Sequence, residues 1–94
     1  MAAVVVWGRE NCMRCWFLCE EFKARGVPHE RRDIGPVVRA ECDLADMSLR
    51  ALMKAYLAFG EKAPVVQVGE WPGARYLTFP EAVIEFGIGR EGKG

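Results

Sequence analysis

The sequence predicts an α/β domain with the element order β-α-β-α-β-β-α. Two short runs rich in β-branched residues, at 3–7 and 64–68, are typical of strands buried inside a sheet. Two longer segments, at 12–26 and 48–60, repeat apolar residues at helical spacing. A capping-box pattern at 78–81 indicates the start of a last helix.

The first strand leads directly into the first helix. Residues 3–7 are continuously apolar, so we expect a strand that is buried on both faces. In the helix that follows, apolar side chains recur at positions i, i+3, i+4 and i+7: Cys15, Leu18, Cys19 and Phe22. The Gly-Val-Pro sequence that begins at Gly26 supplies the end of this helix.

The middle of the chain is less uniform. Residues 29–34 carry many charges, which discourage pairing with other chains and therefore favour an edge strand. Residues 35–47 leave two alternatives open, a short extra helix or a loop packed by its own apolar residues. Helical spacing returns from Ser48 to Phe59, and Gly60 is well placed as the C-terminal cap.

The next segment predicts two strands joined by a turn. Pro64 introduces the run Val65–Val68, and proline is tolerated at the first position of a strand because it need not donate a hydrogen bond there. Gly69 and Glu70 form the turn. We expect residues 71–77 to return as a short antiparallel strand.

The last helix begins at a well-defined signal. Thr78 and Glu81 form a capping box, with a proline in the first turn between them. Gly87 marks the expected end of the helix. Residues 90–94 have no apolar content, and we expect them to fray.

Composition restricts the classes of function. The chain has 94 residues, 51% of them apolar, which suffices for one compact domain. Thirteen basic residues balance thirteen acidic ones, so we expect no nucleic-acid or membrane partner. The sequence has no secretory signal pattern and no apolar run of membrane-spanning length, which predicts a cytoplasmic protein, expected to be monomeric.

The C-x-x-C pair at the first strand-to-helix junction carries the chemistry. A helix N-terminus favours an anion, and both this position and the motif lower the pKa of a thiol, so Cys12 is the candidate nucleophile. Arg9 and Arg14 add positive charge that favours the thiolate. Cys15 lies one turn further along, where it can resolve a mixed disulfide formed on Cys12.

Other interpretations of the cysteines have less support. A structural zinc site normally needs a second ligand pair, and the remaining candidates are isolated from one another in the sequence: Cys19, Cys42 and His29. Cys12, Cys15 and Cys19 do not converge easily on an iron–sulfur cluster within one chain. We therefore expect no metal site, and we expect Cys19 to be an ordinary core residue.

With its order of elements, the chain resembles the glutaredoxin family. The resemblance rests on Cys12-Met-Arg-Cys15 behind an apolar strand, on Ala63-Pro64-Val65, and on the glycine-containing turn before a capped last helix. It covers a single domain at 1–89, with 35–47 as an expected insertion. It implies a thioredoxin-like fold with a mixed four-stranded sheet and helices on both faces. It also implies a cis Pro64, preceded by a residue, Ala63, whose backbone pairs with the substrate.

The resemblance also bears on the electron donor. Arg9 matches the basic residue that the family places before the first cysteine, and Thr78 could offer a hydroxyl and helix N–H groups to a glutathione carboxylate. The usual Pro-Tyr between the cysteines is replaced by Met13-Arg14. Trp71-Pro-Gly-Ala-Arg75 is similar to a stretch of the redoxins that serve ribonucleotide reductase and are reduced by thioredoxin reductase. The donor is therefore either glutathione or that reductase.

These observations predict a small thiol–disulfide oxidoreductase that needs no resident cofactor. Its expected partners are proteins with disulfides, or glutathione. Arg9, Arg14, Ala63, Pro64 and Thr78 are the expected residues of the substrate or glutathione site. One alternative is a non-catalytic thiol module that carries a metal or bridges a [2Fe–2S] cluster between two chains. Another is a relative in fold alone that docks a partner through its Pro64 face.

Overall fold

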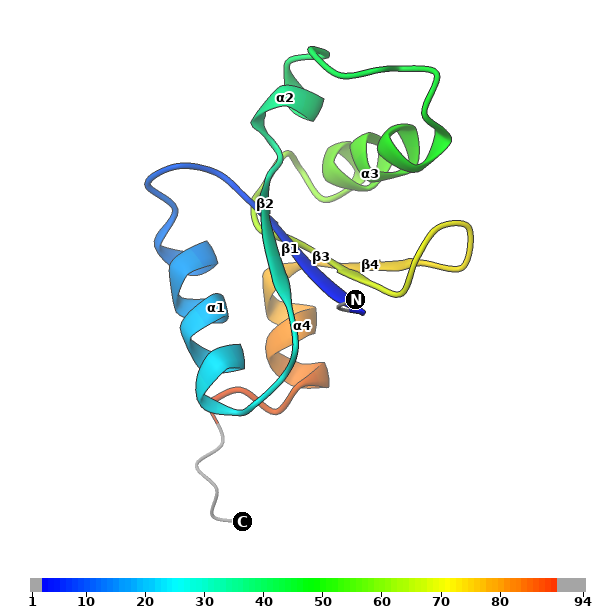
Figure 1. Ribbon diagram of the computed structural model, residues 1–94. Coiled ribbons are helices and arrows are strands. Elements are labelled where there is room, and N and C mark those ends of the chain that lie inside the picture. The colour runs from blue at the N-terminus through cyan, green and yellow to red at the C-terminus, as the bar shows by residue number, and fades with distance from the viewer. Residues whose placement is uncertain (1–2, 90–94) are drawn as a thin grey trace.

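A mixed four-stranded sheet with the order β2-β1-β3-β4 lies at the centre of the molecule (Figure 1). The strands are β1 (Val4–Gly8), β2 (Glu30–Asp33), β3 (Val65–Val68) and β4 (Arg75–Leu77). β1 pairs with β2 in parallel, and the other two pairs are antiparallel. This computed structural model describes residues 3–89, so the expected frayed tail at 90–94 lies outside the described residues. The predicted mixed sheet is confirmed.

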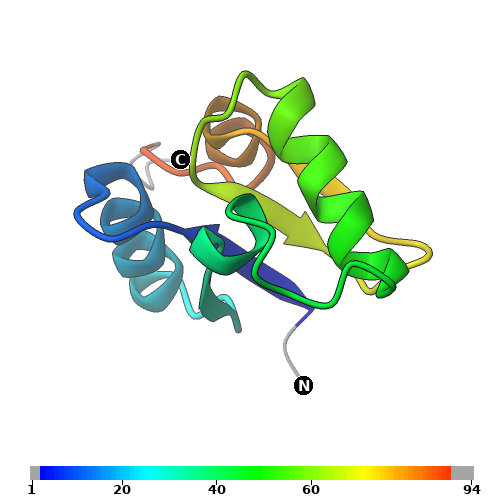
Figure 2. The ribbon, with the colours of Figure 1, turned by 90° about the horizontal axis from the view of Figure 1, so that it is seen from above.

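Within residues 3–89, four helices cover the two faces of the sheet. They are α1 (Met13–Ala24), α2 (Gly35–Val38), α3 (Met47–Ala58) and α4 (Phe79–Glu85). In Figure 1, α1 and α4 lie below the sheet, and Figure 2 shows α2 and α3 lying over the strands from above. Helices on both faces were predicted, and the described order differs from the prediction only by the additional helix α2.

The two faces of the sheet have separate cores because side chains alternate along β1. Val4 and Val6 pack with Leu18 and Phe22 of α1 and with Ala82 of α4. On the other face, two residues of β1 pack with side chains of α2 and α3: Val5, Trp7, Val37, Leu52 and Tyr56. Every residue of β1 is buried, which explains its continuously apolar sequence.

The charged strand β2 lies at one edge of the sheet, as predicted. Its residues are exposed or half-buried and pair with β1 alone. The register places Arg31 beside Val6 and Arg32 beside Trp7. Consecutive arginines of this strand therefore lie on opposite faces of the sheet.

The segment 35–47 contains both a short helix and a loop, the two alternatives that the sequence left open. Pro36 occupies the first turn of α2, and Val37 is buried against the α3 side of the sheet. The chain then continues without regular structure to Asp46, whose side chain caps α3. The segment thus leads the chain from the edge strand to the helix that covers one face.

The capping box at the start of α4 is present as predicted. The Thr78 backbone N–H donates to Glu81 Oε1 at 2.9 Å, and the Glu81 N–H donates to Thr78 Oγ1 at 3.2 Å. These two bonds satisfy groups that a helix start leaves unpaired. No helix within residues 3–89 combines the length and the apolar character needed to cross a membrane.

Candidate functional site

Cys12 is the N-cap residue of α1. Its Sγ accepts a hydrogen bond from the Cys15 N–H at 3.2 Å, and its carbonyl accepts one from the Trp16 N–H at 3.1 Å. The turn before it includes Asn11 with a positive φ of 56°, a conformation that asparagine tolerates better than most residues. The sulfur therefore lies at the positive end of the helix, where a negative charge is stabilised.

Cys12 and Cys15 form a disulfide, and their Cα atoms lie 5.2 Å apart. The two partners differ in exposure, since Cys12 is half-buried and Cys15 has an exposed fraction of 0%. An attacking group from outside therefore reaches Cys12 more readily than Cys15. This asymmetry matches the expected division into a nucleophile and a resolving thiol, although the roles themselves stay predictions.

Gly8 makes room for the buried sulfur. A Cβ added to Gly8 would lie 2.8 Å from the Cys15 Sγ and 3.0 Å from the Cys15 Cβ, both closer than van der Waals contact allows. The strand that leads to the motif thus ends in a residue without a side chain. The close approach of β1 and α1 at this point depends on that glycine.

The segment around Pro64 lies at the same end of the sheet as the loop that leads to Cys12. β1 and β3 are antiparallel with Trp7 beside Val65, so the end of β1 meets the start of β3. The Ala63–Pro64 peptide bond is cis, as the family resemblance implied. Among the described residues, neither backbone group of Ala63 has a hydrogen-bond partner. The Ala63 backbone is therefore available to pair with an extended segment.

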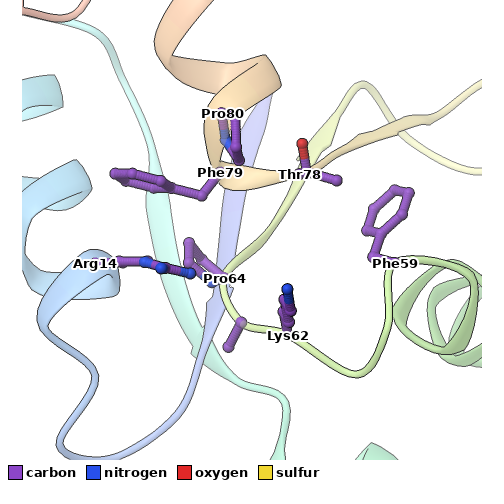
Figure 3. Close-up of a pocket in the computed structure, with 8 residues that line it drawn as sticks. Arg14, Phe59, Lys62, Pro64, Thr78, Phe79 and Pro80 are labelled. Carbon is purple, nitrogen blue, oxygen red and sulfur yellow. The ribbon is translucent and has the colours of Figure 1, made fainter.

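A groove of about 470 Å³ lies between the start of α1, the Pro64 segment and the start of α4 (Figure 3). The following residues line it: Arg14, Phe59, Lys62, Ala63, Pro64, Thr78, Phe79 and Pro80. Four of the predicted site residues are thus brought together, namely Arg14, Ala63, Pro64 and Thr78. In Figure 3 the Arg14 side chain extends toward Pro64, below the ring of Phe79.

The groove is basic although the chain as a whole has no net charge. Arg14 and Lys62 are its charged lining residues, and no acidic residue lines it. The Arg14 guanidinium lies 5.7 Å from the centre of the Phe79 ring, a cation–π contact that holds it at the groove. This arrangement favours a ligand with carboxylate groups.

Arg9 does not join this groove. Its Nη1 donates to the Tyr56 hydroxyl at 3.4 Å, and its side chain lines a different, polar hollow with Asp33 and Arg39. The expectation that Arg9 belongs to the substrate site is therefore not matched by the position of its side chain. The turn at Asn11 separates Arg9 from Cys12, which nearness in sequence does not reveal.

Sequence reasoning missed three residues that the structure brings to the site. Lys62 and Phe79 line the groove, and each is adjacent in sequence to a residue that was predicted, Ala63 or Thr78. Arg31 of β2 lines a second hollow together with Cys12. The alternation of the edge strand could have placed Arg31 on the face that α1 covers.

The remaining cysteines are free thiols. Cys19 is half-buried against the core beneath α1, and this burial raises its pKa above the usual thiol value. Cys42 is half-buried against the core on the α3 side. Within residues 3–89, no three side chains of the metal-binding types His, Cys, Asp and Glu come together in one cluster.

Comparison of the chain with protein-family models, with curated proteins and with solved structures gives no match. The interpretation of this site therefore depends on its own residues and geometry.

Proposed function

We propose that the protein is a small thiol–disulfide oxidoreductase of the glutaredoxin type, with Cys12 as the nucleophile and Cys15 as the resolving thiol. The observation that carries the proposal is the paired, unequal environment of the two cysteines. Cys12 is partly exposed at a helix N-terminus, and Cys15 is buried one turn away within bonding distance. Such a position lowers the pKa of a thiol and makes it a better nucleophile at neutral pH.

The reaction needs no resident cofactor. The Cys12 thiolate attacks one sulfur of a substrate disulfide, and the other half leaves as a thiolate that takes up a proton. Cys15 then loses its proton and attacks the Cys12 Sγ, which releases the first half of the substrate. Two electrons and two protons pass to the substrate, and the pair ends as the disulfide of this structure. Two glutathione molecules or a reductase return the electrons.

The groove that Arg14 lines at the start of α1 is the proposed substrate site, although Cys12 itself lines the neighbouring hollow with Trp16 and Arg31. Its Arg14 and Lys62 suit the carboxylates of glutathione, and the Thr78 hydroxyl, whose oxygen accepts the Glu81 N–H, still has its proton to donate. The available Ala63 backbone can pair with an extended substrate segment like an added strand. Met13 and Trp16, which flank the cysteines, are 74% and 56% exposed and give a protein substrate an apolar surface to contact.

The sheet order, with one parallel and two antiparallel pairs and with helices on both faces, supports the thioredoxin-like fold. The two free thiols, Cys19 and Cys42, together with a reactive C-x-x-C motif, suit a reducing cytoplasmic compartment.

The experiment measures disulfide reduction with two electron donors in parallel. One arm supplies glutathione, its reductase and a glutathione mixed disulfide; the other supplies thioredoxin reductase and a protein disulfide. We expect turnover in at least one arm and a fall to the background rate in Cys12→Ser. Cys42→Ser, which changes a thiol far from the motif, is the control and should keep full activity.

Two results would overturn the proposal. Full activity in Cys12→Ser would remove the nucleophile, and wild-type protein that is inactive with both donors would remove the enzyme. A brown, dimeric protein after anaerobic purification would favour the alternative of a [2Fe–2S] cluster bridged between two chains.

A further inference from the structure

Two neighbouring arginines of the edge strand β2 occupy different environments. Arg32 lies beside Trp7 on the α3 face, with its guanidinium 5.6 Å from the centre of the Trp7 ring and a hydrogen bond to Glu30 at 2.9 Å. Arg31 lies beside Val6, whose side chain belongs to the core beneath α1. Arg31 therefore extends over the face of the sheet that carries the cysteines.

The Arg31 side chain reaches the cysteine pair. The point where a Cβ of Gly8 would lie is 2.9 Å from the Arg31 Nε and 2.8 Å from the Cys15 Sγ, so both atoms lie over the same glycine and flank the same small space. The Arg31 Nη2 donates to the Arg9 carbonyl at 3.0 Å, which holds the guanidinium against the loop that leads to Cys12. Arg31 and Cys12 also line one hollow of about 430 Å³.

The other charged side chains near the start of α1 line different hollows from the one that Cys12 lines. Arg14 of α1 and Lys62 of the Pro64 segment line the groove and not the hollow that holds Cys12. A separate polar hollow is lined by Arg9 and by three other charged residues. These are Glu10 in the loop before α1, Asp33 at the end of β2, and Arg39 after α2. Arg31 is thus the charged residue, among residues 3–89, that lines the Cys12 hollow.

A third thiol on α1 responds to the same charge. Burial raises the pKa of Cys19, and the positive charge of Arg31 is the strongest influence that opposes this rise. Glu20 on the same helix adds to the rise, and Lys23 opposes it less than Arg31 does. Arg31 therefore lies close enough to α1 to influence a thiol on that helix.

We propose that Arg31 is the side-chain cation that stabilises the thiolate of the reduced Cys12–Cys15 pair, in place of the Arg9 and Arg14 that the sequence suggested. The inference deepens the proposed function and rests on it. A positive charge a few ångströms from a thiol favours its ionised form, and the guanidinium can also donate a hydrogen bond to it. Because it stabilises the reduced form, Arg31 also makes the pair a stronger oxidant.

The test measures the pH dependence of Cys12 alkylation in the reduced protein, with the modified peptide identified by mass. Arg31→Gln should raise the midpoint of alkylation by roughly one pH unit, as expected when a nearby opposite charge is lost. Arg31→Lys keeps a positive charge and should therefore leave the midpoint close to the wild-type value. Arg32→Gln is the matched control, since it removes the same charge from the next residue of the same strand and should leave the midpoint unchanged.

Equal shifts in Arg31→Gln and Arg32→Gln, or no shift in either, would overturn the inference. If Arg31→Gln does not fold, Arg31→Met keeps the length of the side-chain stem and supports the same comparison. The two proposals can fail separately. If Arg31→Gln shifts the midpoint but the wild-type protein reduces no disulfide, the proposed function is refuted and the Arg31 inference stands. If the wild-type protein is active but Arg31→Gln leaves the midpoint unchanged, the Arg31 inference is refuted and the proposed function stands.

Discussion

Gly8→Ala tests the close packing on which the cysteine pair depends. The added Cβ would lie 2.8 Å from the Cys15 Sγ and 3.0 Å from its Cβ. Non-bonded atoms of these kinds need roughly 3.5–4.0 Å, so α1 must move away from β1 by up to about 1 Å. The third close atom is the Arg31 Nε at 2.9 Å, which belongs to a flexible side chain and can move aside. The cost therefore comes from Cys15, which the helix holds in place.

The expected cost follows from two opposing effects. Overfilling a packed interior lowers the free energy of unfolding by about 1–3 kcal/mol. Replacing glycine by alanine also restricts the unfolded chain, which returns about 0.4–1 kcal/mol. The midpoints of these two ranges, about 2 and about 0.7 kcal/mol, give an expected net loss of roughly 1.3 kcal/mol. For a domain of this size, each kcal/mol corresponds to about 4–8 °C in the melting temperature.

The assay is urea unfolding of the reduced protein, with Gly73→Ala as the matched control. A Cβ on Gly73 would meet its nearest atom, the Glu70 carbonyl oxygen, at an ordinary 3.8 Å, so this variant should be as stable as the wild type or slightly more stable. The cost of Gly8→Ala should also decrease when it is measured in a Cys15→Ala background, where the Sγ contact is gone. Equal stability of Gly8→Ala and Gly73→Ala would refute the reasoning.

Two further predictions concern helix caps. Thr78→Ala removes the oxygen that accepts the Glu81 N–H and should lower the free energy of unfolding by about 1 kcal/mol, whereas Thr78→Ser should not; a stable Thr78→Ala in urea unfolding would contradict this. The Ser48 hydroxyl and backbone N–H lower the pKa of Asp46, so its cap stabilises the fold above the usual aspartate pKa and is lost as the pH falls through the lowered value. The stability difference between wild type and Asp46→Ala, measured by urea unfolding from pH 7 to pH 3, should therefore shrink at acid pH, and a difference that is constant over this range would count against it.

Most of the secondary structure could be predicted because its signals are local. The capping box at Thr78 depends on neighbours three residues apart, and the position of Cys12 depends only on where a buried strand gives way to helical spacing. The segment 35–47 could not be predicted because α2 is only four residues long. One turn gives no periodicity, and the burial of Val37 against the α3 side depends on distant parts of the chain.

The charged residues of the site were predicted from their nearness to Cys12 in the sequence, and their positions in space follow a different order. Arg9 and Arg14 are near Cys12 in the sequence, yet Arg9 turns to Tyr56 and Arg14 turns to the groove. Arg31 comes nineteen positions after Cys12, and the pairing of β2 with β1 brings it to the hollow that Cys12 lines. Electrostatic effects follow distance in space, and the sheet register sets that distance here.

The two faces of β2 explain how one charged strand can serve two purposes. The sequence of β2 is a continuous run of charged residues, which is typical of an edge strand. Successive side chains nevertheless point to opposite faces of the sheet. The register separates the charges, because Arg32 lies over the indole of Trp7 while Arg31 and Cys15 both lie close to the space above Gly8. A side chain on Gly8 would occupy the space that Arg31 and Cys15 flank. β1 therefore contributes twice, because Gly8 leaves this space open and the register of β1 with β2 places Arg31, and not Arg32, on the same face.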